Sequence, residues 1–116
     1  MAAEAAAAAF LERAGLRVIE RNVRFARGEI DLVCREGDVL VFVEVKCRRS
    51  AWGDDPAAAV SGLKQWRLTR LARLYLKWRG LGEPRCRFDV VAVIADDGAA
   101  PVVIRHLRGA FDAVER

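Results

Sequence analysis

The charged residues Asp31, Glu44 and Lys46 stand in a segment that is rich in Ile, Leu, Val and Phe, "EIDLVCREGDVLVFVEVK", residues 29–46. Strands of this composition usually lie in a protein core, where a charged group needs a partner or a chemical role. Carboxylates bind hard cations such as Mg²⁺ or Mn²⁺, a metal-activated water attacks phosphate esters, and an ammonium group stabilises developing negative charge. The residue types therefore indicate metal-dependent phosphodiester hydrolysis.

A β-hairpin would bring these residues together. Residues 37–38, "GD", are a two-residue turn signal between two strand-like runs. With that turn, Asp31 lies opposite Glu44. Two residues further out, Glu29 lies opposite Lys46. Directly opposed residues project from the same face with Cβ atoms about 4.5–5.5 Å apart. The other face of the hairpin is expected to be a continuous core surface of Ile30, Leu32, Cys34, Val41, Val43 and Val45.

The same spacing also fits a structural role. Lys46 would then pair with a nearby carboxylate at a solvated hairpin end, and Glu29 is its expected surface partner, since such ion pairs are common. A three-residue loop would shift the register by one residue and place Asp31 opposite Val43, which removes the site. The spacing alone leaves the catalytic and the structural interpretation open.

The elements that position the hairpin follow from periodicity and caps. Residues 2–14 are expected to be a helix that ends at Gly15, and strand character follows over residues 16–25. A long helix is predicted from Asp54-Asp55-Pro56 to about Arg79, with Gly62 as a weak point and Gly80 as its end. Two more strands, "RFDVVAVIA" and "PVVIRHL", and a short closing helix at 109–115 complete the chain.

The predicted order is therefore α-β-β-β-α-β-β. The long helix acts as a right-handed crossover, so the strands before and after it are expected to be parallel. The fold class is α/β, with a mixed central sheet flanked by helices. With 116 residues, 53% of them hydrophobic, the chain is expected to form one domain, residues 1–116.

Composition narrows the classes of function. The net charge of +4 permits a polyanionic partner without requiring one. The longest apolar run is shorter than the roughly 18 residues that span a bilayer, so no membrane association is expected. The three cysteines show no CxxC spacing, and because Cys34 and Cys47 lie in or beside predicted strands, buried free thiols are expected, as in a reducing cytoplasm. The Ala-rich start is expected to be a helix and not a signal peptide.

The segment "RNVRFARGEIDLVCREGDVLVFVEVKCRRS" resembles the YraN family of small bacterial proteins, which belongs to the PD-(D/E)xK nuclease-like superfamily. "FLERAGLRVIERN", "KQWRLTRLARLYL" and "RFDVVAV" extend the resemblance over most of the chain. It implies a restriction-endonuclease-like αβββαβ core, as in archaeal Holliday-junction resolvases, and a Mg²⁺- or Mn²⁺-dependent endonuclease acting on DNA, including branched or otherwise structured DNA. By position, Asp31 and Glu4 resemble metal carboxylates of the family, and Glu44 and Lys46 resemble its E-x-K pair, in which the glutamate is also a metal ligand.

Two positions depart from the family pattern. Ala3 stands where a glycine usually precedes the helix glutamate, and Cys47 stands where threonine is common. Neither departure removes a ligand that the resemblance implies.

A second group of residues predicts contact with nucleic acid. Arg70, Arg73 and Lys77 fall within about 60° of one helix face, together with Trp66. Such a face can follow a phosphate backbone, although an ordinary solvated helix face explains it as well. Further candidates for nucleic-acid contact are Arg21, Arg24, Lys64 and Gln65. Arg21 and Arg24, together with Asn22, could hold a phosphate or brace the site, although a solvated strand edge explains them as well. Core or interface roles are expected for Trp52 and Trp78, and structural roles for Asp89 and His106.

Two other functions compete with the nuclease. One is a non-catalytic nucleic-acid-binding module that keeps the fold, which predicts salt-sensitive binding without turnover. The other is an interaction domain, for example a homodimer, that uses the Trp-bearing helix surface. The acidic pair with its lysine favours the nuclease.

Overall fold

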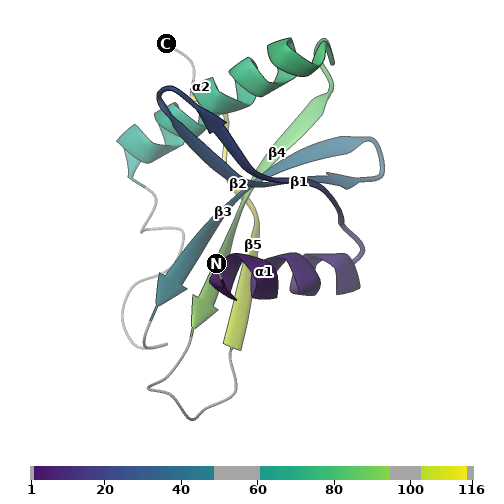
Figure 1. Cartoon of the computed structure of the whole chain (residues 1–116), viewed down its shortest axis with the longest axis vertical. Coiled ribbons are helices and arrows are strands. Elements are labelled where there is room, and N and C mark those ends of the chain that lie inside the picture. Colours follow the sequence, from purple (N-terminus) through teal and green to yellow (C-terminus); the bar gives the residue numbers. More distant parts are fainter. Residues whose placement is uncertain (1, 49–60, 95–102, 115–116) are drawn as a thin grey trace.

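The computed structural model describes residues 2–48, 61–94 and 103–114 of the chain (Figure 1). The elements are α1 (Ala2–Arg13), β1 (Arg17–Phe25), β2 (Gly28–Glu36), β3 (Val39–Arg48), α2 (Gly62–Arg79), β4 (Arg85–Ile94) and β5 (Val103–Phe111). The predicted order α-β-β-β-α-β-β is therefore confirmed.

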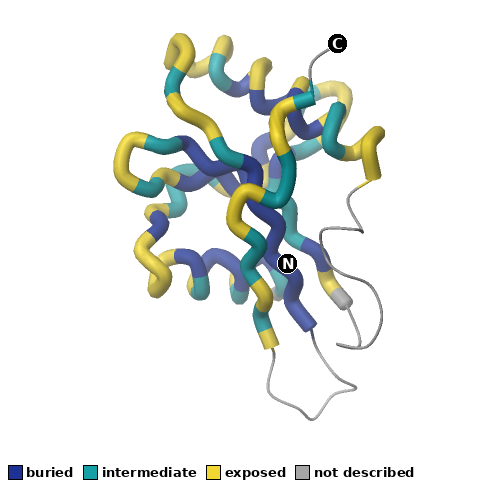
Figure 2. Tube along the Cα trace, turned by 180° about the vertical axis from the view of Figure 1, so that it is seen from behind, coloured by how far each residue is buried: buried dark blue, intermediate teal, exposed yellow. Residues whose placement is uncertain are grey.

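The five strands form one mixed sheet in the order β1-β2-β3-β4-β5. Among the described strands β3 and β4 form the parallel pair, and α2 lies between them in the chain, as expected for a crossover. The helices cover opposite faces, because alternate residues of a strand point to opposite sides. On β3, Val41 and Val43 pack in the cluster that contains Leu11 of α1, whereas Leu40 and Phe42 pack in the cluster of α2. Figure 2 shows the buried strand centres between the two helices.

The β2–β3 hairpin keeps the predicted register only over part of its length. Pairing runs from Glu36–Val39 to Leu32–Val43 and ends there. One residue further, the backbone N–H of Val45 donates to the Asp31 carboxylate at 2.8 Å, so a side chain replaces the next strand partner. Beyond this point β2 turns away from β3 together with β1 (Figure 1). The expected backbone pairs Asp31–Glu44 and Glu29–Lys46 are therefore absent from the ladder, and Ile30 packs with the α2 cluster instead of with Leu32.

The described part of α2 begins at Gly62, the expected weak point, because Ser61 is extended (φ −61°, ψ 162°) and its Oγ accepts from Lys64 N at 3.2 Å. The expected start at 54–56 lies outside the described residues. Two other expectations are wrong. Over 109–115, β5 continues to Phe111 and residues 112–114 form no helix. Cys34 is buried as expected, but Cys47 and Cys86 are exposed. The predicted end of α2 is confirmed, because Gly80 caps it in the left-handed region (φ 63°).

Among the described residues, neither helix combines the length and the apolar character that a bilayer span requires.

Candidate functional site

Three carboxylates from two elements meet where β2 leaves β3. Glu4 comes from the first turn of α1, and Glu29 and Asp31 come from β2. One oxygen from each can be chosen so that all three lie within 4.8 Å of one another. We call these residues the acidic cluster. Together with Asn22 and Arg24 they line a cleft of about 410 Å³. Glu4 is 8% exposed and the other two acids are half-buried.

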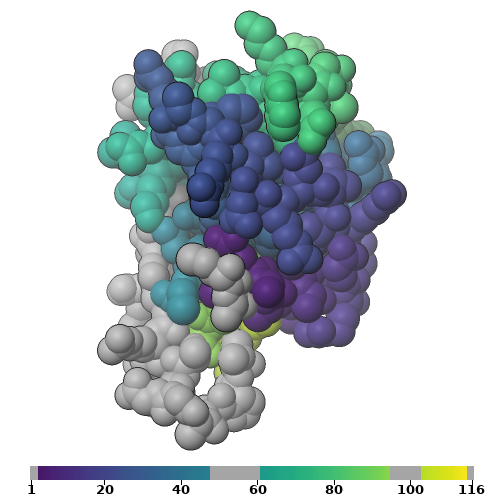
Figure 3. Space-filling model, in the orientation of Figure 1, coloured from purple at the N-terminus to yellow at the C-terminus, as the bar shows by residue number. Residues whose placement is uncertain are grey.

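The alanine-rich sequence of α1 explains how Glu4 reaches the sheet. Ala7 and Ala8 are fully buried, and with no side chain beyond Cβ they let the helix lie close to the strands. Glu4 stands one turn before them and therefore faces the sheet. A carboxylate in the first turn is also stabilised by the helix dipole. Figure 3 shows the first residues of α1 (dark purple) directly below the β1–β2 hairpin.

Asn22 connects the two elements of the acidic cluster. Its side-chain amide donates to Glu29 Oε1 at 2.9 Å and to Glu4 Oε2. Asn22 lies in β1 with φ 52°, a left-handed conformation that is unusual inside a strand but that asparagine tolerates better than most residues. The pairs on either side, Arg21–Leu32 and Val23–Ile30, keep the same register. The unusual backbone conformation is thus confined to the residue whose side chain holds two acids.

The acidic cluster carries more negative charge than its surroundings neutralise. Burial raises the pKa of Asp31, the hydrogen bond from Val45 N–H lowers it, and the negative charges of Glu44, Glu4 and Glu29 raise it, so that together they bring this pKa to about 7. A bound cation would remove the repulsion. Clustered, partly buried carboxylates beside an open cleft are the donor set that a hard divalent ion takes, with waters in its remaining positions.

Glu44 and Lys46 lie beside this cluster on the α2 face of the sheet. Lys46 Nζ is 3.2 Å from Glu44 Oε1, and Lys46 is only 8% exposed. Glu44 and Glu29 together line a second cleft of about 180 Å³ under α2. Glu29 therefore faces both clefts and joins the acidic cluster to the Glu44–Lys46 pair. The expected pairing of Glu29 with Lys46 is wrong, since Glu29 pairs with Arg24 at 3.3 Å.

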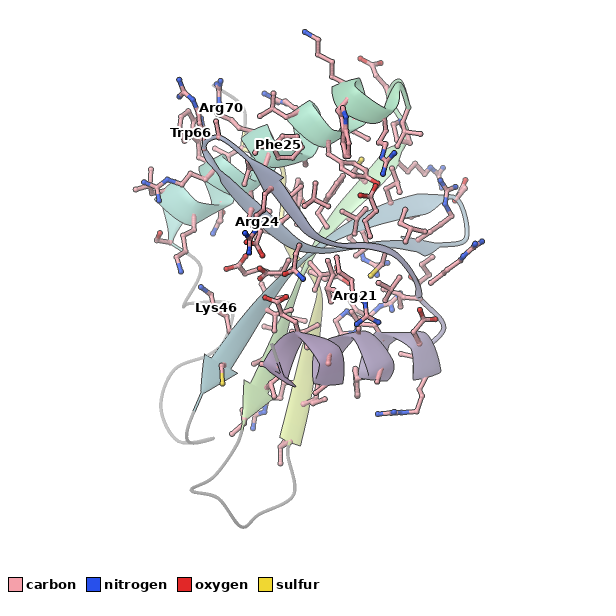
Figure 4. The ribbon with its side chains drawn as sticks, in the orientation of Figure 1. Arg21, Arg24, Phe25, Lys46, Trp66 and Arg70 are labelled. Atoms are coloured by element: carbon pink, nitrogen blue, oxygen red, sulfur yellow. The ribbon has the colours of Figure 1, made fainter. Side chains whose placement is uncertain are left out.

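The candidates for nucleic-acid contact differ in how near they lie to the two clefts. Arg24 lines the cleft of the acidic cluster, and Lys64 lines the second cleft. Arg70 lies over the ring of Trp66 at 5.1 Å from its centroid, whereas Figure 4 shows Arg21 on the side of α1, away from them. The remaining candidates on α2 are Gln65, half-buried, and Arg73 and Lys77, both exposed.

Other singled-out residues lie outside the cluster. Asp89 is fully buried and accepts from Arg87, Gly109 N and His106, in agreement with a structural role for both Asp89 and His106. Trp78 is 58% exposed, so it is not a core residue. Trp52 lies outside the described residues.

Sequence reasoning undervalued Glu29 and Asn22. The signal for Glu29 was its spacing of two residues from Asp31, which places both on one strand face. The signal for Asn22 was its occurrence in a strand, where asparagine is disfavoured.

Comparison with known proteins gives one consistent result. Residues 3–93 match the model of "Uncharacterised protein family UPF0102". A UPF0102 protein of Symbiobacterium thermophilum is 58% identical over 92 residues, which cover 79% of this chain and 78% of the relative. A UPF0102 protein of Moorella thermoacetica is 47% identical over 108 residues, 93% of this chain and 90% of the relative. One from Rhodococcus jostii is 47% identical over 105 residues, 90% and 88% of the two chains.

Proposed function

The chain belongs to the uncharacterised protein family UPF0102, the YraN family, and from this premise and the site geometry we propose that it is a metal-dependent endonuclease that hydrolyses phosphodiester bonds of DNA. The observation that carries the proposal is the acidic cluster, whose carboxylates lie within 4.8 Å of one another without enough positive charge to neutralise them. A cluster that serves stability alone is normally paired with arginine or lysine. DNA is proposed as the substrate on the family resemblance and on the net charge of +4.

The acidic cluster and Glu44 would hold Mg²⁺ or Mn²⁺. When bound, the ion supplies a water of lowered pKa and positive charge at the scissile phosphate. Val45 N–H fixes the orientation of the Asp31 carboxylate through one oxygen, and Asn22 fixes Glu29 and Glu4 in the same way. These hydrogen bonds pre-organise the ligands, so that little rotational freedom is lost on binding.

Lys46 has a separate role in this mechanism. Its ammonium group is held by Glu44 at 3.2 Å and is largely buried, so it cannot be screened fully by water. An ammonium group at this place stabilises the negative charge that develops on the phosphate oxygens. The positive charge of Lys46 is therefore expected to matter for cleavage more than for metal binding.

The test combines metal titration with cleavage of linear and branched DNA in Mg²⁺ or Mn²⁺. We expect Asp31→Asn to lose both metal binding, measured by calorimetry, and cleavage. Lys46→Ala is expected to lose cleavage while it still binds the metal. Asp38→Asn, an exposed aspartate in the β2–β3 turn, is the matched control and should behave as wild type. Metal-dependent cleavage that survives both site substitutions would contradict the proposal.

A non-catalytic nucleic-acid-binding module is the second candidate. It is favoured by the cation-lined surface of α2 and the β1–β2 hairpin, which does not depend on a metal. It predicts salt-sensitive DNA binding with no cleavage in any divalent metal.

A further inference from the structure

Two clefts flank the β1–β2 turn where it rests on α2. A Cβ added at Gly28 would lie 3.2 Å from Leu71 Cδ1, so the turn and the helix are in direct contact. The first cleft, about 620 Å³, is lined by Arg27, Leu63, Trp66, Arg67, Arg70, Leu71 and Leu74. The second, about 710 Å³, is lined by Arg24, Phe25, Leu74, Lys77 and Trp78. We call them the α2 clefts. Figure 3 shows the hairpin (blue) between the two ends of α2 (teal and green).

The α2 clefts are positively charged. Their lining includes five cationic side chains, and no carboxylate is among the residues that line them in the described part of the chain. The cations come from both elements, with Arg24 and Arg27 in the hairpin and the others on α2. Charge of one sign on both walls of a cleft attracts a polyanion.

The same clefts expose aromatic rings. Trp78 is 58% exposed, and its ring lies edge to face with Phe25 at 6.2 Å between centroids. Arg79 lies 4.2 Å from the Trp78 centroid, and Arg70 lies 5.1 Å from that of Trp66. Trp78 is exposed and Trp66 is half-buried, and each lies beside a guanidinium group, an arrangement on which bases can stack.

The α2 clefts are continuous with the candidate active site. Arg24 lines both the second α2 cleft and the cleft of the acidic cluster. Arg27 and Leu71 line both the first α2 cleft and the cleft of Glu29 and Glu44. In Figure 4, the residues Trp66, Arg70, Phe25 and Arg24 lie above Lys46. A nucleic-acid strand bound in the second α2 cleft would therefore reach the acidic cluster. A strand bound in the first α2 cleft would reach Glu29 and Glu44.

We infer that the α2 clefts bind a single-stranded segment of nucleic acid, whose backbone then passes over the acidic cluster. An intact duplex keeps its base faces stacked inside, so exposed aromatic rings are useful only for unpaired bases. A second copy of this chain fits the clefts less well, because a two-fold interface would bring the same arginines of both copies together. The step from binding to cleavage rests on the proposed endonuclease function, whereas the binding itself does not.

The test measures binding without any metal, so it stays separate from the test of cleavage. Fluorescence anisotropy of a labelled oligothymidylate of about 20 nucleotides, and of a duplex of equal length, is recorded in EDTA with the Asp31→Asn protein. We expect the single strand to bind more tightly than the duplex. Trp78→Ala should weaken its binding about tenfold, and Trp78→Phe should keep most of it, since a stacking ring remains.

Charge is tested with matched double variants. Arg67→Ala with Arg70→Ala should weaken single-strand binding at least tenfold and reduce its dependence on salt. Arg13→Ala with Arg17→Ala removes the same charge from exposed positions at the end of α1 and the start of β1, and should change binding less than threefold. Circular dichroism checks that each variant is folded. The inference would be overturned by equal affinity for duplex and single strand, or by an equal loss of affinity in the control variant. It would also be overturned if the Arg67→Ala, Arg70→Ala variant changed the molar mass of the protein in solution but left its DNA binding unchanged.

Discussion

The two ends of β2 contribute carboxylates to two groups that differ in how their charge is neutralised. At its start, Glu29 and Asp31 join Glu4 in the acidic cluster. At its end, Glu36 accepts from Arg87 at 2.7 Å and from Arg108 at 2.9 Å. Arg87 also donates to the buried Asp89 at 2.8 and 2.9 Å, and His106 Nε2 lies 2.7 Å from the same carboxylate. We call Glu36, Asp89 and their cationic partners the arginine network.

The two groups have opposite pKa shifts. Hydrogen bonds from Arg108 and Arg87 lower the pKa of Glu36 to about 2. Burial raises the pKa of Asp89, but the hydrogen bonds from His106, Arg87 and Gly109 N outweigh it and the pKa falls to about 2. In the acidic cluster, burial and like charges raise the pKa of Asp31 to about 7. Both acids of the arginine network are hydrogen-bonded to arginine, whereas in the acidic cluster Arg24 pairs with Glu29 but Asp31 accepts from a backbone N–H and keeps a raised pKa.

The largest expected effect is on stability in the arginine network. Asp89→Ala should lower the free energy of unfolding by about 3–5 kcal/mol, because it removes one partner of a buried ion pair and leaves Arg87 and His106 without it. The measurement is urea unfolding followed by circular dichroism. Glu36→Gln is the matched control at the more exposed end of the network and should cost less than about 1 kcal/mol. A loss below that for Asp89→Ala would mean that the network does not stabilise the sheet.

In the acidic cluster, a substitution is expected to raise the free energy of unfolding instead of lowering it. Asp31→Asn should raise the free energy of unfolding in EDTA at pH 8 by about 1–3 kcal/mol, because it removes repulsion while the amide oxygen still accepts from Val45 N–H. The folded protein binds the Asp31 proton more tightly than the unfolded chain does. The stability that this proton gives is fully present below pH 3.8, the ordinary pKa, and is lost as pH rises through about 7.

The pH series sharpens this second prediction. Urea unfolding of wild type and Asp31→Asn between pH 4 and pH 8 should show the two proteins diverging as the pH rises. The arginine network affects the pH dependence of stability at low pH. Its stabilisation is present above the ordinary carboxyl pKa values and is lost as pH falls towards about 2. Parallel curves for the two proteins across pH 4–8 would contradict the charge imbalance of the acidic cluster.

The order of elements was predictable because most helices and strands have a local sequence signal, and pairing in the sheet acts in the same direction. Runs of apolar and β-branched residues on either side of a turn signal define β2 and β3, and Gly80 ends α2 as expected. Residues 109–115 have helical propensity, but pairing with β4 overrides it. Phe111 pairs with Phe88 in the ladder, and the two rings stack at 4.9 Å between centroids. Ser61 is the N-cap of the described part of α2, a cap signal that counting from residues 54–56 did not single out.

The candidate site was predictable only in part, because its geometry departs from a regular hairpin. Counting along an ideal ladder places Asp31 on the same face as Glu44 and Lys46. Counting cannot show that the Asp31 side chain takes the place of a backbone partner, so that β2 turns away and Glu29 meets Glu4. Glu4 was named only from the family resemblance, since nothing local connects residue 4 with residue 31.

The smallest expected effect is a difference in Mn²⁺ binding between variants of Glu29 and Glu36, two glutamates of the same strand. Glu29→Gln should weaken Mn²⁺ binding by about tenfold, or about 1.4 kcal/mol, because it removes one charge from a cluster that keeps Asp31 and Glu4. The binding constant is measured by calorimetry at pH 8. Glu36→Gln removes the same charge from an acid already neutralised by two arginines and should leave Mn²⁺ binding unchanged. Equal effects of the two substitutions would show that only the overall negative charge attracts the ion, and that the position of Glu29 between the two clefts has no part in holding it.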